Sequence, residues 1–142
     1  MELLTIDFLI LHSNNGVIKM KNSEYFSFIE LNGRSLSEIN PGSEEVALNA
    51  DDALQAIEIL KKNSTTPVLG GDVLTNNNKE LIYAYQFWGN EYHCLNWYCE
   101  KKDDESIEEY INRSYITAKD CINKANETAK NLGTKCYIAL VV

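Results

Sequence analysis

The feature that most constrains the fold is a long amphipathic segment near the C-terminus, followed almost at once by an apolar run. Ser106-Ile107-Glu108-Glu109 has the spacing of a capping box, which predicts that a helix begins there. The stripe that follows recurs at helical spacing as far as Gly133 and comprises Ile107, Tyr110, Ile111, Ser114, Ala118, Ile122, Ala125, Ala129 and Leu132. Residues 135–142 are almost wholly apolar, so we predict a last strand that lies inside a sheet.

Other segments carry weaker signals. Residues 50–62 show a second amphipathic pattern, and the Asn49 side chain can cap the helix that this pattern predicts. Residues 23–33 favour a helix over a strand, with Ser23 as a possible cap. Residues 34–45 read as an ordered connection, and residues 3–21 predict an N-terminal hairpin around a Ser-Asn-Asn-Gly turn.

An aromatic-rich region precedes the long helix. Glu80–Trp88 and Glu91–Glu100 have apolar residues on both faces and are separated by Gly89-Asn90. We therefore predict two central strands joined as a hairpin.

A diglycine follows the short run Pro67–Leu69, which predicts a strand. Adjacent glycines permit positive φ, and Asp72 can hydrogen-bond to neighbouring amides. We interpret Gly70-Gly71-Asp72 as a turn built by backbone need. The alternative is that Asp72 is a metal ligand or a polar contact to a partner.

Together these patterns predict an α+β fold, with a largely antiparallel sheet packed against helices that include one long C-terminal helix. At 142 residues, the chain 1–142 has the length of one domain. Its 21 acidic and 13 basic residues give a net charge of −8, which disfavours nucleic acid as a partner. The same charge would steer a basic protein toward the chain, although solubility alone explains it equally well.

The sequence shows no catalytic or cofactor motif. No phosphate-loop spacing surrounds the diglycine, and His12 and His93 do not assemble a catalytic site. Four cysteines at irregular spacing form no convincing zinc pair, which fits a cytosolic chain. The run Phe8–Leu11 is too short to span a bilayer, so we expect no membrane partner. Because no motif for a cofactor or a metal is present, we also expect neither of them.

Aromatic residues lie beside carboxylates along residues 80–105, as is typical of a protein-binding surface. The candidate anchors are Asp72, Trp88, Trp97 and Tyr98, and the candidate steering carboxylates are Glu91, Glu100, Asp103 and Asp104. The alternative is that both tryptophans belong to the core.

Four motifs in order, ALNADDALQAIEILKK, PVLGGDV, NWYCE and ESIEEYINRS, resemble the bacterial immunity protein 40 family of polymorphic toxin systems. The resemblance extends from Val46 to the last strand and leaves residues 1–21 outside. The family-like positions are Gly70, Gly71, Asp72, Asn96, Trp97, Tyr98, Tyr110, Arg113 and Ser114. The resemblance implies a cytoplasmic protein, without enzyme activity, that binds a cognate toxin domain and occludes its active site. Toxin nuclease domains are often basic, so the implied role agrees with the acidic net charge of this chain.

Two other hypotheses stay open at this stage. One is a small ligand-binding or metal-assisted enzyme that uses Asp72 and nearby carboxylates. The other is a scaffold that oligomerises through its apolar strands. The sequence fixes neither the oligomeric state nor the toxin.

Overall fold

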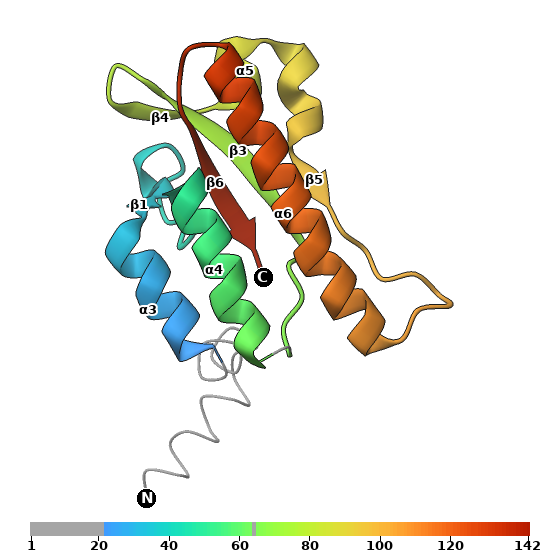
Figure 1. Ribbon diagram of the computed structural model, residues 1–142. Coiled ribbons are helices and arrows are strands. Elements are labelled where there is room, and N and C mark those ends of the chain that lie inside the picture. The colour runs from blue at the N-terminus through green and yellow to red at the C-terminus, as the bar shows by residue number, and fades with distance from the viewer. Residues whose placement is uncertain (1–21, 64) are drawn as a thin grey trace, which may run out of the picture.

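The computed structural model describes residues 22–63 and 65–142, which form helices and a six-stranded antiparallel sheet (Figure 1). The strands are β1 Arg34–Ser35, β2 Val46–Asn49, β3 Gly70–Asn77, β4 Glu80–Tyr83, β5 Trp97–Tyr98 and β6 Cys136–Val141. The α-helices are α3 Ser23–Asn32, α4 Ala50–Asn63, α5 Ala84–Trp88 and α6 Ile107–Asn131, with 3-10 helices η1 Leu36–Glu38 and η2 Asn90–Leu95. The predicted α+β fold with a long C-terminal helix is confirmed. That the whole chain forms one domain stays a prediction.

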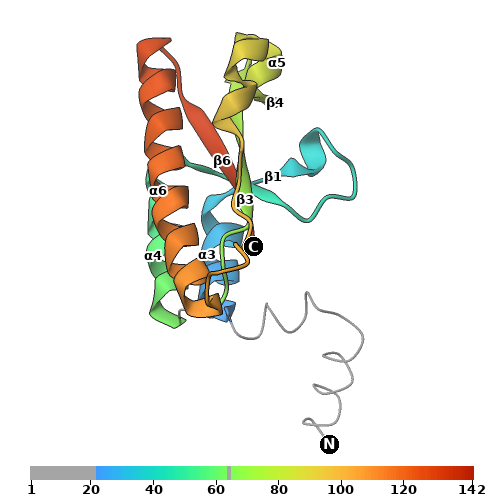
Figure 2. The same cartoon turned by 90° about the vertical axis from the view of Figure 1, so that its right-hand side faces the viewer.

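The sheet has helices on one face. Figure 2 shows α3, α4 and α6 on one side of the sheet, while the segment of β1 and η1 projects from the other side. The main core lies between the helices and the sheet and includes Ile57, Ile122 and Ile138. The predicted stripe of α6 faces this core, except that Ile107 and Leu132 at its two ends are exposed.

The predicted helix starts depend on side-chain caps. Ser106 Oγ accepts from the Glu109 amide at 3.1 Å, and Glu109 Oε1 accepts from the Ser106 amide at 3.0 Å, which completes the predicted capping box. Asn49 Oδ1 accepts from the Asp52 amide at 2.8 Å, as predicted for the start of α4. For α3 the helix prediction is confirmed, but the cap position is Asn22 rather than Ser23.

The last strand occupies the centre of the sheet, as predicted. The strand order is β1-β2-β6-β3-β4, so β6 lies between β2 and β3. Strand β2 was not predicted, and the predicted connection 34–45 contains β1 and η1. The predicted N-terminal hairpin lies outside the described residues.

The interpretation of Gly70-Gly71-Asp72 as a turn is wrong, because these residues begin the central strand β3. Both positions require glycine, because Trp97 leaves no room for a side chain there. A Cβ atom on Gly70 would lie 2.4 Å from the Trp97 carbonyl oxygen, and one on Gly71 would lie 2.2 Å from Trp97 Cη2. Residues 67–69, predicted to form a strand, come before β3.

The predicted hairpin of Glu80–Trp88 and Glu91–Glu100 is also wrong. Strand β4 ends at Tyr83, and the chain then forms α5 and η2 before the two-residue strand β5. The hairpin in this region joins β3 to β4 through Asn78 and Lys79, which have φ values of 50° and 74°. Aromatic residues fit helices and strands alike when a core surface is near, so their strand propensity misled the prediction.

Substitution of Gly71 by alanine tests the close approach of β5 to β3. The added Cβ would clash with the Trp97 ring, so we expect Gly71→Ala to lower the free energy of unfolding by about 1–3 kcal/mol. Trp97→Phe removes the ring atoms that the new methyl group meets. In that background the cost of Gly71→Ala should therefore shrink, as measured by urea unfolding of the four proteins of the cycle. Additive costs would contradict this explanation.

Candidate functional site

Strand β3 pairs with one strand along one edge and with two short strands along the other. One edge of β3 pairs with β6, while on the other edge β4 pairs with residues 74–77 and β5 pairs with Gly70 and Gly71. The Val73 amide lies between these two partners and donates to Asn96 Oδ1 at 2.8 Å. A side chain thus completes the edge where no strand is available.

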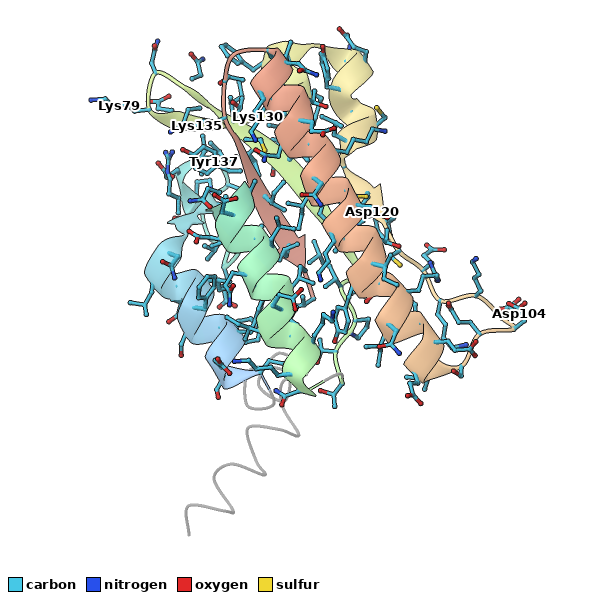
Figure 3. All side chains as sticks on the ribbon, in the orientation of Figure 1. Lys79, Asp104, Asp120, Lys130, Lys135 and Tyr137 are labelled. Carbon is cyan, nitrogen blue, oxygen red and sulfur yellow. The ribbon has the colours of Figure 1, made fainter. Side chains whose placement is uncertain are left out.

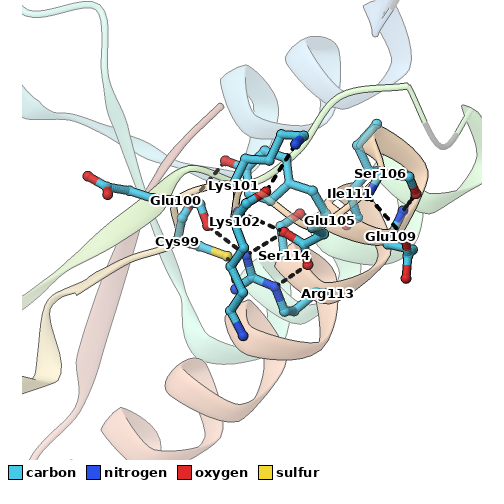
Figure 4. Close-up of polar contacts among 11 residues, drawn as sticks. Cys99, Glu100, Lys101, Lys102, Glu105, Ser106, Glu109, Ile111, Arg113 and Ser114 are labelled. Atoms are coloured by element: carbon cyan, nitrogen blue, oxygen red, sulfur yellow. Dashed lines mark hydrogen bonds and ion pairs between the residues drawn. The ribbon is translucent and has the colours of Figure 1, made fainter.

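Residues 96–105, which we call the strap, carry β5 along this edge and then lead to α6. The Cys99 amide donates to the Leu69 carbonyl at 2.8 Å, and the Tyr110 hydroxyl donates to the Cys99 carbonyl at 2.7 Å. Arg113 Nη2 donates to the Glu100 carbonyl at 2.6 Å (Figure 4). The strap is therefore fastened both to the sheet and to the long helix.

Glu105 closes the strap through Arg113. The Arg113 guanidinium donates to both carboxylate oxygens of Glu105, at 2.6 and 2.9 Å (Figure 4). The Glu105 side chain is 10% exposed. The hydrogen bond from Arg113 lowers the pKa of Glu105 to about 2, with a further contribution from the Lys102 amide. Glu109, four residues from Arg113, is instead engaged in the capping box.

The face of the sheet opposite the helices is only partly covered. Successive strand residues point to opposite faces, and Val73 points into the main core, so Asp72 points the other way. Residues from η1, β2, β3, β4 and β6 form a small second core there, namely Leu36, Ala47, Leu74, Leu81 and Ala139. Beyond this cluster the face is open.

The open part of this face forms a hollow of about 960 Å³, which we call the open-face hollow. Its lining includes Glu45, Asp72, Tyr83, Tyr85, His93, Trp97, Tyr98, Glu100, Lys101 and Val141. Tyr98 is 83% exposed, and its neighbour Trp97 packs against the main core. The rings of Tyr83 and Tyr85 have centroids 6.0 Å apart, and Tyr85 meets His93 edge-on at 4.6 Å.

Asp72 is the electrostatic centre of the open-face hollow. Desolvation raises the pKa of this half-buried carboxyl group, and the nearby His93 opposes the shift only in part. The pKa of Glu45 is raised by desolvation and then by Asp72, and the pKa of Tyr83 is raised by the same causes. Within the described residues, no side chain or amide forms a hydrogen bond or an ion pair with the Asp72 carboxylate.

The structure brings together four of the eight predicted binding residues. Asp72, Trp97, Tyr98 and Glu100 line the open-face hollow. Asp104 lies at the tip of the loop that precedes α6, away from the sheet, and Asp103 lies beside it in the same turn (Figure 3).

The remaining predicted residues, Trp88 and Glu91, are placed differently. Glu91 is exposed on η2. Trp88 packs against the main core, as Trp97 does, and neither indole N–H has an acceptor among the described residues. Their contact with a partner stays a prediction.

Sequence reasoning missed Glu45, Tyr83, Tyr85 and His93. The sequence predicts a strand over residues 80–88, whereas Tyr83 is the last residue of β4 and Tyr85 lies on α5. Glu45 is the last residue of the predicted connection 34–45 and His93 lies on η2, and no local pattern relates them to Asp72.

In residues 22–63 and 65–142, no group of three or more His, Cys, Asp or Glu side chains could hold a metal ion. In the same ranges, no helix has the length and apolar character needed to cross a membrane.

The profile of the family described as immunity protein 40 matches residues 35–142. The chain belongs to the immunity protein 40 family. No curated protein and no solved structure matches the sequence. The match begins upstream of Val46, where the motif resemblance starts, and so includes η1 and the partial cover of the open face.

Family membership indicates an immunity protein of toxin systems and implies a cognate toxin as partner. Such proteins are generally not enzymes. Most of the family-like positions hold the strap in place, since the contacts described above involve Gly70, Gly71, Asn96, Tyr110 and Arg113. Ser114 instead ties α6 to the segment before β3, because its Oγ accepts from the Val68 amide at 3.0 Å. Asp72 and Tyr98 differ from these, because their side chains face the open-face hollow.

Removal of the Glu105 charge tests the strap. The folded chain lowers the pKa of Glu105 from 4.5 to about 2, so its stabilising contribution is complete above pH 4.5 and is lost as the pH falls toward 2. We expect Glu105→Gln to be less stable than the wild type at neutral pH, and we expect the gap to narrow between about pH 5 and about pH 3. Urea unfolding across this range measures the gap. Asp104→Asn, on the same loop, is the control, and an equal gap for both variants would contradict the assignment.

Removal of the Asp72 charge tests whether this residue serves the fold. Burial without a partner makes the ionised form less stable in the folded chain than in the unfolded chain. We therefore expect Asp72→Asn to raise the melting temperature at neutral pH. The gain should shrink as the pH falls and the wild-type carboxyl group takes up a proton. Calorimetry at neutral and acidic pH checks this, and a lower melting temperature at neutral pH would show that Asp72 supports the fold.

Proposed function

We propose that this chain neutralises a cognate toxin domain by binding it through the open-face hollow and covering the toxin's active site. The inhibition is steric and involves no covalent step. Support comes from the family, whose members are immunity proteins, and from the open sheet face, which carries aromatic rings and carboxylates. The site of action would be the cytoplasm of the producing cell.

The observation that carries this proposal is the unpaired carboxylate of Asp72. A half-buried charge at the middle of a sheet costs folding free energy, and a chain retains such a group most readily where a partner uses it. The surrounding tyrosines supply large contact area at low entropic cost, as aromatic residues do at binding hot spots.

Tyr98 is the best-placed aromatic anchor. It is 83% exposed, yet its backbone is fixed by pairing with Gly70 and by the fastened strap. A backbone that is already ordered loses little freedom on binding, which favours affinity. Trp97 packs against the main core and is only partly buried, so it would offer a partner a smaller contact area than Tyr98.

The exposed carboxylates would steer the encounter. Glu91, Glu100, Asp103 and Asp104 are all exposed, and the chain as a whole carries −8. A basic toxin domain, such as a nuclease, would be attracted to these charges over a distance that shortens as the ionic strength rises. Glu100, Asp103 and Asp104 lie on the strap, so the contacts of Arg113 hold these three charges near the open-face hollow. Glu91 lies on η2 instead.

One observation favours the alternative function. A carboxyl group with a raised pKa, lying in a hollow beside an imidazole and a phenol, is also the pattern of a ligand-binding or hydrolytic site. Turnover of a substrate by the purified chain, abolished by Asp72→Asn without loss of folding, would favour this alternative over toxin binding.

The proposed function is tested by co-expression with the toxin domain encoded in the neighbouring reading frame. The wild-type chain should restore growth, and Tyr98→Ala should weaken toxin binding by about 30-fold, the effect of a typical hot-spot residue. Ile116→Ala is the matched control, since Ile116 is 62% exposed on α6, on the opposite side of the sheet. Titration calorimetry measures both affinities. Cells that die equally with and without the wild-type chain would refute the proposal.

A further inference from the structure

We propose that the open-face hollow receives an arginine side chain of the toxin domain, with the guanidinium against the Asp72 carboxylate and between the surrounding rings. This inference rests on the proposed function and names the chemistry of the partner at its central contact.

The charge of the lining calls for a cation. Three carboxylates line the open-face hollow, those of Glu45, Asp72 and Glu100. Lys101 adds a permanent positive charge to the same lining. The Lys101 ammonium group donates to the Lys102 carbonyl at 3.0 Å (Figure 4). It is therefore engaged by the strap and forms no ion pair with Asp72. Three carboxylates thus outnumber one ammonium group, and Asp72 is half-buried while Glu45 and Glu100 are exposed.

The rings select the kind of cation. Tyr83, Tyr85 and His93 form a connected row of rings with centroid separations of 6.0 and 4.6 Å, and Tyr98 contributes a further ring on β5. A guanidinium is planar, weakly hydrated and always charged, so it can stack on such rings while it donates two hydrogen bonds to one carboxylate. An ammonium group is compact and more strongly hydrated, and it gains less from the same surroundings.

The same chain shows the chemistry at another place. Arg113 donates to both oxygens of Glu105 and lies 5.6 Å from the centroid of the Tyr110 ring. That arrangement consists of a carboxylate, a guanidinium and a phenol ring. In the open-face hollow the carboxylate and the phenol rings are present, and the described residues supply no guanidinium.

The size of the open-face hollow places the arginine at the centre of a larger contact. A volume of about 960 Å³ exceeds what one side chain fills, so neighbouring toxin residues would cover Tyr98 and Glu45. Desolvation of the rim strengthens the central charge pair, as it does at binding hot spots.

A titration of the full chain tests the inference without the toxin. The probes are N-acetyl-arginine methylamide and, as controls of matched length, the citrulline and lysine analogues. Amide chemical shifts of Asp72, Tyr85, His93 and Tyr98 are followed by NMR. We expect the arginine probe to shift these signals with an affinity at least about tenfold above that of either analogue.

Two variants sharpen the test. Asp72→Asn should weaken binding of the arginine probe by about 10- to 100-fold, the usual loss for a charge-assisted hydrogen bond. Asp120→Asn, exposed on α6, is the control and should leave the titration unchanged (Figure 3). Absence of shifts, equal shifts with citrulline or lysine, or an unaffected Asp72→Asn variant would each overturn the inference. Concentration-dependent shifts at these amides without probe would indicate a second copy of the chain in the open-face hollow, which also overturns it.

The outcome separates the two proposals. Growth rescue without arginine binding would retain toxin neutralisation and reject the arginine contact. Arginine binding without growth rescue would retain an arginine site in the open-face hollow and reject toxin neutralisation, and with it the toxin as the source of the arginine.

Discussion

The close approach of β5 to β3, which requires two residues without side chains on β3, is the constraint on which the rest of the structure depends. Gly70 and Gly71 let the Trp97 backbone and ring lie directly against the strand. Once β5 is in place, Asn96 completes the edge, and Tyr110 and Arg113 fasten the strap to α6. The same contact presents Tyr98 on the opposite face, so the packing that holds the fold also positions the candidate binding surface.

Elements specified by local chemistry could be predicted from the sequence. The capping box, the stripe of α6 and the apolar run of β6 are each contained within a few consecutive turns or residues, and each was located correctly. The diglycine could not be interpreted in this way. Its purpose depends on Trp97, a distant residue, and the same dipeptide is typical of turns. The region 84–95 failed for a related reason, because its aromatic residues pack well in either conformation.

The candidate site shows the same division. Asp72, Trp97, Tyr98 and Glu100 were identified from residue type and neighbourhood, and the fold brings them to one hollow. Glu45, Tyr83, Tyr85 and His93 join them from separate segments, which no local pattern connects. The motifs that carry the family resemblance are mainly those that hold the strap.

The position of β6 has a consequence for synthesis. It follows all the other described elements in the chain, yet it lies between β2 and β3 at the middle of the sheet. The ribosome must therefore release residues 136–141 before the sheet can close, and the earlier strands have no central partner until then. Since non-local pairing of this kind slows folding, the chain would reach its folded form only after translation has passed this strand.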